Sequence, residues 1–201
     1  MRARVALAVW SERPSAAPHD RKCGVVLRAG CCRLAIVGFV STPRQGPQDI
    51  TIDNIFEALR ESHEIQRKLC RQLVRIKPDD SRALEIFRDL RIELAAHAAA
   101  EERFLYAQIL LDDMGLKSSR HALAEHHEID ECVEELAKAR GQHEVWPELA
   151  KKLSHEVHHH LREEERKFFQ VSGKILSEKQ KKVLANKYRK DLQRMRTVVA
   201  P

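Results

Sequence analysis

Two blocks of this chain repeat one pattern of histidine and glutamate, and this internal repeat restricts the fold more than any other feature. The blocks are ELAAHAAAEERFLY at residues 93–106 and EVHHHLREEERKFF at residues 156–169. Aligned without a gap, His97 corresponds to His160, and Glu101 corresponds to Glu164. Each glutamate follows its histidine by four residues, which places both side chains on one face of a helix, one turn apart.

Two further histidines complete the repeat. His97 follows His63 by 34 residues, and His160 follows His126 by the same 34 residues. Pairing with the adjacent His127 instead gives a separation of 33 residues, so spacing alone leaves both histidines as candidates. A helical wheel centres the apolar residues of this segment close to His126 and turns His127 away from them. We therefore expect His126 to face the core and His127 to be its neighbour on the solvent side.

From Thr51 onward the sequence is typical of a helical protein, with five segments bounded by helix start and stop signals. The first ends before Pro78, because a residue that precedes proline avoids the helical conformation. Short connections force neighbouring helices to reverse direction. We predict an all-α fold, an antiparallel up-down four-helix bundle with an extra C-terminal helix and a poorly ordered N-terminal arm. The predicted helices cover about residues 53–76, 81–112, 118–140, 146–171 and 178–197.

Residues 1–48 form the arm, which differs from the rest of the chain in composition. It contains eight basic and two acidic side chains and so accounts for the whole net charge of +6. Such a composition is typical of a targeting segment, and it is equally compatible with sequence read from upstream of the true start. The predicted organisation is therefore the arm, a bundle at residues 51–172 and an appended basic helix at residues 177–197.

Composition also excludes several classes of function. The chain after the arm has no net charge, which argues against a nucleic-acid-binding surface. No apolar run approaches the roughly 20 residues of a membrane-spanning helix. The five cysteines include no CxxC pair, so they provide neither a disulfide framework nor zinc-ribbon spacing. We expect a cytoplasmic protein in a reducing compartment.

The repeat predicts that four imidazoles and two carboxylates meet in the middle of the bundle. The candidate metal ligands are His63, His97, Glu101, His126, His160 and Glu164. This set suits two first-row transition metals, with terminal imidazoles and carboxylates that bridge both ions. Six-coordinate ions would keep an open position for dioxygen, peroxide or nitric oxide. Iron fits better than zinc, because structural zinc prefers four tetrahedral ligands, often including cysteine. The other histidines are most simply surface residues, namely His121, His127, His143, His155, His158 and His159.

The order H–HxxxE–H–HxxxE, with EERFLY and EEERKFF closing the two halves, resembles the hemerythrin-like family, also called the HHE cation-binding domain. The similarity covers roughly residues 52–170. It implies a non-haem diiron centre, with two iron ions held by the six candidate ligands in a four-helix bundle. Oxygen-carrying hemerythrins have a further histidine one turn along the third helix, where this chain has Asp130. This departure favours oxidative or sensing chemistry over reversible oxygen carriage.

Three functions follow as alternatives. The chain is predicted to bind iron and a small gaseous or peroxide ligand, to be a diiron enzyme that removes peroxide or nitric oxide, or to be a regulatory module that senses iron or oxygen. No catalytic residue is assigned, although Tyr106 lies near the predicted ligands and core packing is its commoner role. Glu93 and Glu156 each precede a repeat histidine by four residues. They are candidates for orienting an imidazole, with surface placement as the more common outcome. No protein partner is assigned, and the basic segment at residues 179–196 is the surface where one would bind.

Overall fold

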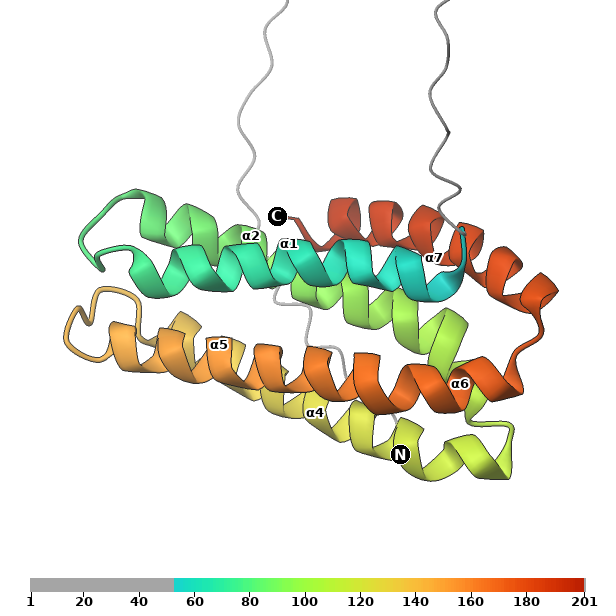
Figure 1. Cartoon of the computed structure of the whole chain (residues 1–201). Coiled ribbons are helices and arrows are strands. Elements are labelled where there is room, and N and C mark those ends of the chain that lie inside the picture. The colour runs from blue at the N-terminus through green and yellow to red at the C-terminus, as the bar shows by residue number, and fades with distance from the viewer. Residues whose placement is uncertain (1–52, 201) are drawn as a thin grey trace, which may run out of the picture. The chain divides into compact units, whose positions relative to one another are not determined.

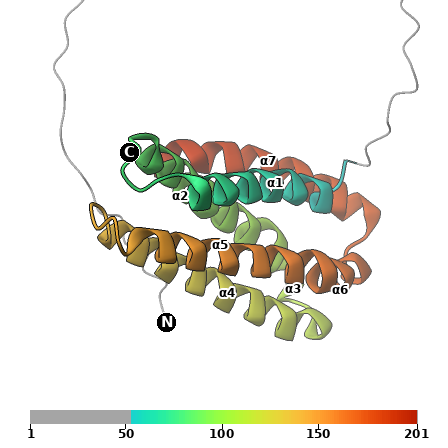
Figure 2. The same ribbon diagram turned by 60° about the vertical axis from the view of Figure 1, so that its left-hand side comes forward.

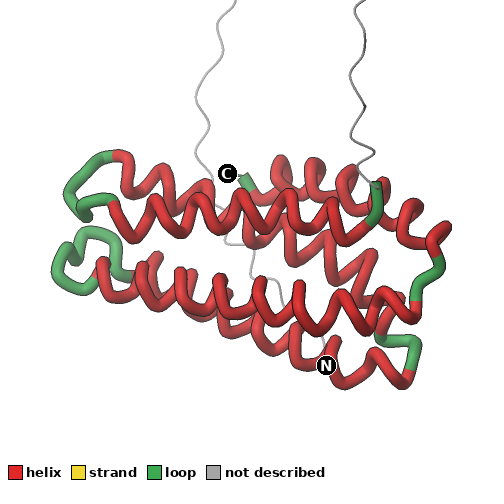
Figure 3. The backbone as a smooth tube through the Cα atoms, viewed as in Figure 1, coloured by secondary structure: helices red, strands yellow, loops and turns green. Residues whose placement is uncertain are grey.

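The computed structural model describes residues 53–200, and in this part of the chain the backbone consists of helices and the loops between them (Figure 3). The predicted arm at residues 1–48 lies outside the described residues. The long helices are α1 (Ile55–Arg75), α2 (Arg82–Glu101), α4 (Asp113–Lys138), α5 (Trp146–Glu163) and α7 (Glu178–Val199). Short segments prolong two of them, namely η1 (Glu102–Tyr106) and α3 (Ala107–Ile109) after α2, and η2 (Glu164–Phe168) and α6 (Phe169–Ile175) after α5.

Successive long helices run in opposite directions, as the sequence predicted (Figure 1). Helix α1 packs against α2 and α5, and α4 packs against α5. The fifth helix, α7, lies along α1 and α2, so it covers the first half of the bundle (Figure 2). The prediction of an all-α bundle with an added C-terminal helix is confirmed. None of the described helices combines the length and the apolar character that a membrane crossing requires.

Local sequence explains where several helices begin. Helix α1 is capped by Asn54, whose side chain accepts hydrogen bonds from the backbone N–H groups of Phe56 and Glu57. Helix α7 begins with a capping box, in which Ser177 and Gln180 bond each other's backbone. Each cap satisfies backbone donors that a helix start would otherwise leave free.

The boundary between the second and third predicted helices was wrong. Helix α4 begins at Asp113, several residues before the predicted start at Ser118 or Ser119. The cause is Asp112, whose carboxylate accepts a hydrogen bond from the backbone N–H of Met114 at 2.9 Å and so caps the helix early. Gly115 therefore lies inside the first turn of α4.

Buried side chains divide the bundle into two apolar ends with a polar middle. Along α1, Ile55 and Leu59 belong to one apolar cluster, and Cys70 and Leu73 belong to another. Between them on the same helix lies His63, which is completely buried. Ends packed from apolar residues stabilise the fold, and they exclude water from the polar band in the middle.

Gly115, next to the α3–α4 connection, lies in a tightly packed place, whereas Gly173 in α6 has more room around it. A Cβ atom at Gly115 would overlap the side chain and carbonyl oxygen of Ile109, whereas a Cβ at Gly173 would lie 3.8 Å from Phe56. We expect Gly115→Ala to lower the free energy of unfolding by about 1–3 kcal/mol, because it overpacks this turn. Gly173→Ala is the matched control and should leave stability unchanged or raise it by up to about 1 kcal/mol, since alanine is the better helix former. Denaturation in urea followed by circular dichroism measures both, and equal midpoints would contradict the expectation.

Candidate metal centre

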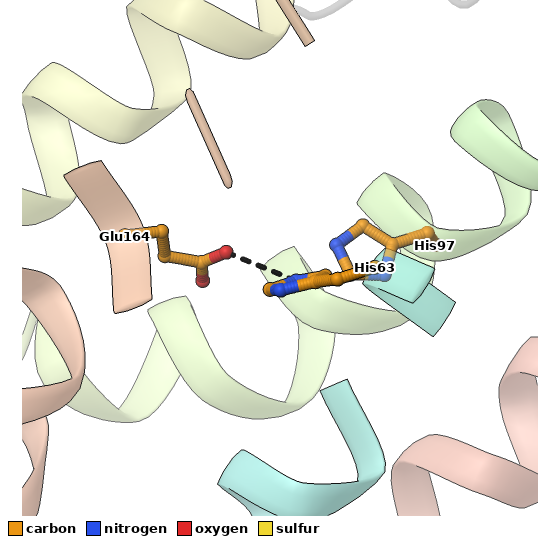
Figure 4. Close-up of side chains that lie close together, drawn as sticks. All are labelled: His63, His97 and Glu164. Carbon is orange, nitrogen blue, oxygen red and sulfur yellow. Dashed lines mark ion pairs between the residues drawn. The ribbon is translucent and has the colours of Figure 1, made fainter. Parts of the chain in front are cut away.

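The structure brings all six predicted ligand residues together in the polar middle of the bundle. They fall into two groups of three residues. Within each group, one nitrogen or oxygen atom from each residue lies within 4.8 Å of those from the other two. The first group is His63, His97 and Glu164, shown in Figure 4, and the second group is Glu101, His126 and His160. The most exposed member, His126, retains only 7% of its accessible surface. The site thus offers two adjacent positions for a cation, each surrounded by two imidazoles and a carboxylate.

Each of the two carboxylates also faces an imidazole of the other group. Oε2 of Glu164 lies between His63 of its own group and His160 of the second. The Oε2–Nε2 distances are 3.3 Å for Glu164–His63, 3.9 Å for Glu164–His160, 3.3 Å for Glu101–His97 and 3.6 Å for Glu101–His126. Each carboxylate thus lies between the imidazoles of both groups, a position compatible with the bridging role expected from the sequence.

Whether a metal fits depends on the atoms that point into the centre, and several of these atoms have no hydrogen-bond partner in the protein. Among the described residues, Nε2 of His63, Nε2 of His97, both oxygens of Glu101 and Oε2 of Glu164 are buried without a hydrogen bond. Leaving a buried carboxylate uncompensated costs several kcal/mol. The two imidazole nitrogens and the carboxylate around each position are ligand types that first-row transition metals accept. The residues present therefore fit a binuclear metal site.

The outward nitrogen of every imidazole, Nδ1, has a partner. The Nδ1 contacts are with Glu165 at 2.7 Å for His63, Glu102 at 2.9 Å for His126, Glu125 at 3.1 Å for His160 and Tyr188 at 2.7 Å for His97. A partner at Nδ1 fixes the ring orientation and leaves Nε2 directed at the centre. None of these four residues was predicted from the sequence to have this role.

Two adjacent glutamates contact both ring nitrogens of one histidine on another helix, and this happens once in each half of the bundle. Glu164 faces Nε2 of His63, and the next residue, Glu165, bonds Nδ1 of the same ring. The doublet of Glu101 and Glu102 holds His126 in the same way. The EE doublet, repeated in both halves of the sequence, is the signal from which this arrangement could have been predicted.

The chain leaves the α-helical register directly after each inward glutamate. In η1 the N–H of Ala107 bonds the carbonyl of Glu102, five residues back, and in η2 Phe169 bonds Glu164 in the same way. Such π-helical turns occur frequently at functional sites. They bury consecutive aromatic and apolar residues, so that the Tyr106 ring stacks on His126 with centroids 5.5 Å apart. Phe169 stacks on His63 at 6.0 Å.

The remaining candidates lie outside the centre. The side chain of His127 is 76% exposed and pairs with Glu131, in agreement with its predicted place on the solvent side. Glu93 was expected on the surface and is 5% exposed, because Arg196 of α7 covers it and bonds both its oxygens at 2.7 Å. Glu93 contacts no imidazole directly, since its other partner is the hydroxyl of Ser62 at 2.6 Å. Glu156 is partly exposed.

Burial and neighbouring charges both shift the pKa values of the titratable groups in the centre, and at His63 the two effects oppose each other. Burial opposes a charge on His63, yet its contacts with Glu164 and Glu165 outweigh burial and raise its pKa to about 9. Burial lowers the pKa of His97 well below its ordinary value, and the charge on His63 acts in the same direction. Burial and the neighbouring Glu101 raise the pKa of Glu164. A proton on His63 thus balances part of the carboxylate charge, a role that a bound cation would take over.

A small cavity opens beside three of the four imidazoles. Its volume is about 10 Å³, which suits one molecule of about the size of water. The lining residues are Gln66, Leu94, His97, Ala98, His126, Ile129, Asp130 and His160. Asp130, which stands where the resemblance implied a further histidine in oxygen carriers, therefore borders the centre at this cavity.

Comparison with known proteins agrees with this geometry. Residues 54–171 match the family described as Hemerythrin HHE cation binding domain. Among solved structures, a hemerythrin HHE cation binding domain-containing protein from Mycobacterium kansasii superimposes with a TM-score of 0.66 at 20% sequence identity. The superposition covers 72% of this chain and 88% of the mycobacterial chain, and at this identity it supports the fold alone. A search of curated protein sequences gave no match.

The unpartnered carboxylates predict that a divalent cation stabilises the bundle. Adding Fe²⁺ or Co²⁺ under anaerobic conditions to metal-free protein should raise the melting temperature, because the cation binds the folded state alone. At a free concentration of 100 times Kd the gain is about 2.7 kcal/mol. Calorimetry measures the shift, and the Glu101→Ala/Glu164→Ala double variant, which has lost both carboxylates, should show little of it. An unchanged melting temperature of the wild-type protein would contradict the prediction.

Proposed function

The chain belongs to the hemerythrin HHE cation-binding domain family, and from this membership we propose that it is a non-haem diiron protein that binds iron and a small ligand such as dioxygen, peroxide or nitric oxide. The observation that carries the proposal is the convergence of buried histidines and glutamates in two adjacent groups. Nε2 of His63, Nε2 of His97 and three oxygens of the two glutamates have no hydrogen bond there. In the proposed site, one ion is held by His63, His97 and Glu164 and the other by Glu101, His126 and His160.

Iron is favoured by the donor set. The two groups contain imidazole and carboxylate ligands alone, whereas structural zinc commonly takes cysteine thiolates. The described cysteines, Cys70 and Cys132, are buried in the apolar cluster at one end of the bundle. Burial raises the pKa of Cys70 to about 12, which disfavours the thiolate form that binds metals. When bound, iron would supply redox chemistry and an open coordination position for the small ligand.

The protein's own residues support a small ligand. The cavity beside the centre has room for about one water-sized molecule, which favours a small ligand. Leu94, Ala98 and Ile129 provide apolar lining, and Gln66 and Asp130 provide hydrogen-bonding groups. This mixture favours a weakly polar guest that a single hydrogen bond orients.

Peroxide or nitric oxide removal is the second candidate function, and Tyr106 is the residue that favours it. Its phenol oxygen lies 3.4 Å from Oε1 of Glu164 inside the completely buried centre. Burial raises the pKa of Tyr106 well above its ordinary value, so the phenol keeps its proton and remains able to donate it in a hydrogen bond. A phenol that bonds a proposed iron ligand would supply the proton that reduction of peroxide requires.

Iron content tests the proposed function and the register of the ligands together. Protein purified from iron-supplied cells should contain about two irons per chain, since the two groups define two positions. His97→Ala and His160→Ala should each lose at least one of them. The matched control is His159→Ala, because this neighbouring histidine is 50% exposed and should leave the iron content unchanged. Mass-spectrometric metal analysis makes the measurement, and wild-type protein without iron would refute the diiron function.

Two assays on the iron-loaded protein separate binding from catalysis. A change in the absorption spectrum on adding nitric oxide or dioxygen is expected for a binding protein. Sustained oxygen release from hydrogen peroxide would instead establish the enzymatic alternative. In that case Tyr106→Phe should slow the release about 100-fold or more, the usual cost of removing a proton donor.

A further inference from the structure

Corresponding residues in the two halves of the bundle are separated by a constant number of positions along the sequence. One partner of a ligand histidine departs from this correspondence. His63 and His126 are 63 positions apart, as are His97 and His160. The same shift relates Glu102 to Glu165, the partners of His126 and His63. Nδ1 of His160 is held by Glu125, and the counterpart of Glu125 in the first half is Ser62. The first half therefore lacks a carboxylate where the second half has one.

Ser62 does not replace the missing carboxylate as the partner of His97. Its hydroxyl is directed at Oε1 of Glu93, at 2.6 Å. The phenol oxygen of Tyr188 occupies the position instead, 2.7 Å from Nδ1 of His97. Tyr188 belongs to α7 and is completely buried. A helix beyond the family match at residues 54–171 thus reaches a residue of the metal centre.

Several contacts fix α7 in the orientation that delivers this phenol. Arg196 bonds both oxygens of the buried Glu93 at 2.7 Å, which ties the end of α7 to α2. Arg189 pairs with Glu61 of α1 at 2.8 Å. Leu184 and Leu192 are buried in the same apolar cluster as Tyr188. The phenol is therefore held by a helix anchored on two sides, so its position relative to His97 is determined by the fold.

We propose that Tyr188 is a positioning residue of the metal centre, which holds His97 with Nε2 directed at the first group. The inference rests on the proposed function. A neutral imidazole that binds a metal through Nε2 carries its proton on Nδ1, so His97 donates and the phenol oxygen accepts. Without this acceptor the ring of His97 is free to turn, and Nε2 loses its direction.

Because His97 is held by a phenol where His160 is held by a carboxylate, the two metal positions should also differ in affinity. In the second group both histidines are supported by carboxylates, Glu102 and Glu125. In the first group His63 has Glu165, whereas His97 has a neutral hydroxyl. A carboxylate partner raises the basicity of an imidazole ligand. The first position should therefore bind its ion more weakly than the second, and it should depend on Tyr188 for the affinity that it has.

The test is a Tyr188→Phe variant, which keeps the ring and removes the hydroxyl. Metal-free wild-type and variant proteins are titrated with Co²⁺ under anaerobic conditions, and binding is followed by absorption and calorimetry. The wild-type protein should bind two ions. In Tyr188→Phe the affinity for one of them should fall about 10- to 100-fold, the usual cost of losing such a partner, while the other ion binds as before.

Leu192→Ala is the matched control for loosened packing of α7. Leu192 is buried in the same helix, so the variant should lower the melting temperature and retain both affinities. Equal loss of affinity in Leu192→Ala and Tyr188→Phe would show that α7 acts through stability alone and would overturn the proposal. The proposal would also be overturned if Tyr188→Phe bound both Co²⁺ ions with the affinities of the wild-type protein, and this result would leave the diiron function unaffected. A wild-type protein that binds no Co²⁺ and no iron would instead refute the proposed function itself.

Discussion

The fold is organised around two carboxylates, Glu101 and Glu164, buried at the centre of a helical bundle with imidazoles on every side. Charges in such a place are unfavourable unless a cation or a proton compensates them. The apolar clusters at the two ends of the bundle have to supply the stability that the polar middle does not. Along α1 this division appears as two apolar stretches with His63 between them, and it couples folding to occupancy of the centre.

The centre is rigid because each histidine directs Nε2 at the metal position while its Nδ1 is held by a second residue. A glutamate doublet serves both purposes, because consecutive residues contact opposite nitrogens of one imidazole, as Glu164 and Glu165 do with His63. The π-helical turns that begin at these doublets bury Tyr106 and Phe169, whose rings pack on His126 and His63. The helix register, the ring packing and the hydrogen bonds therefore fix the same histidines, which is the preorganisation that a metal site needs.

The sequence predicted the fold and the six central residues because both depend on spacing. Histidine and glutamate four residues apart, repeated at the same distance in each half, define faces of helices that have to meet. Spacing does not reveal the start of α4, which depends on the cap at Asp112, nor the π-helical turns, which change the helical period itself. The role of Tyr188 was also beyond reach, since it lies 91 residues from His97 and depends on how α7 docks.

The two halves keep the inner residues identical and differ in what surrounds them. The histidines and glutamates correspond one to one, whereas Ser62 stands opposite Glu125 and Phe169 stands opposite Tyr106. The second group thus has the additional carboxylate and the ring with a hydroxyl, and the first group has the fifth helix. Because outer partners set the basicity and direction of an imidazole, two positions with the same ligands acquire different affinities. We infer that the second group binds its ion more tightly, and that the affinity of the first group depends on the C-terminal helix, which supplies the partner of His97.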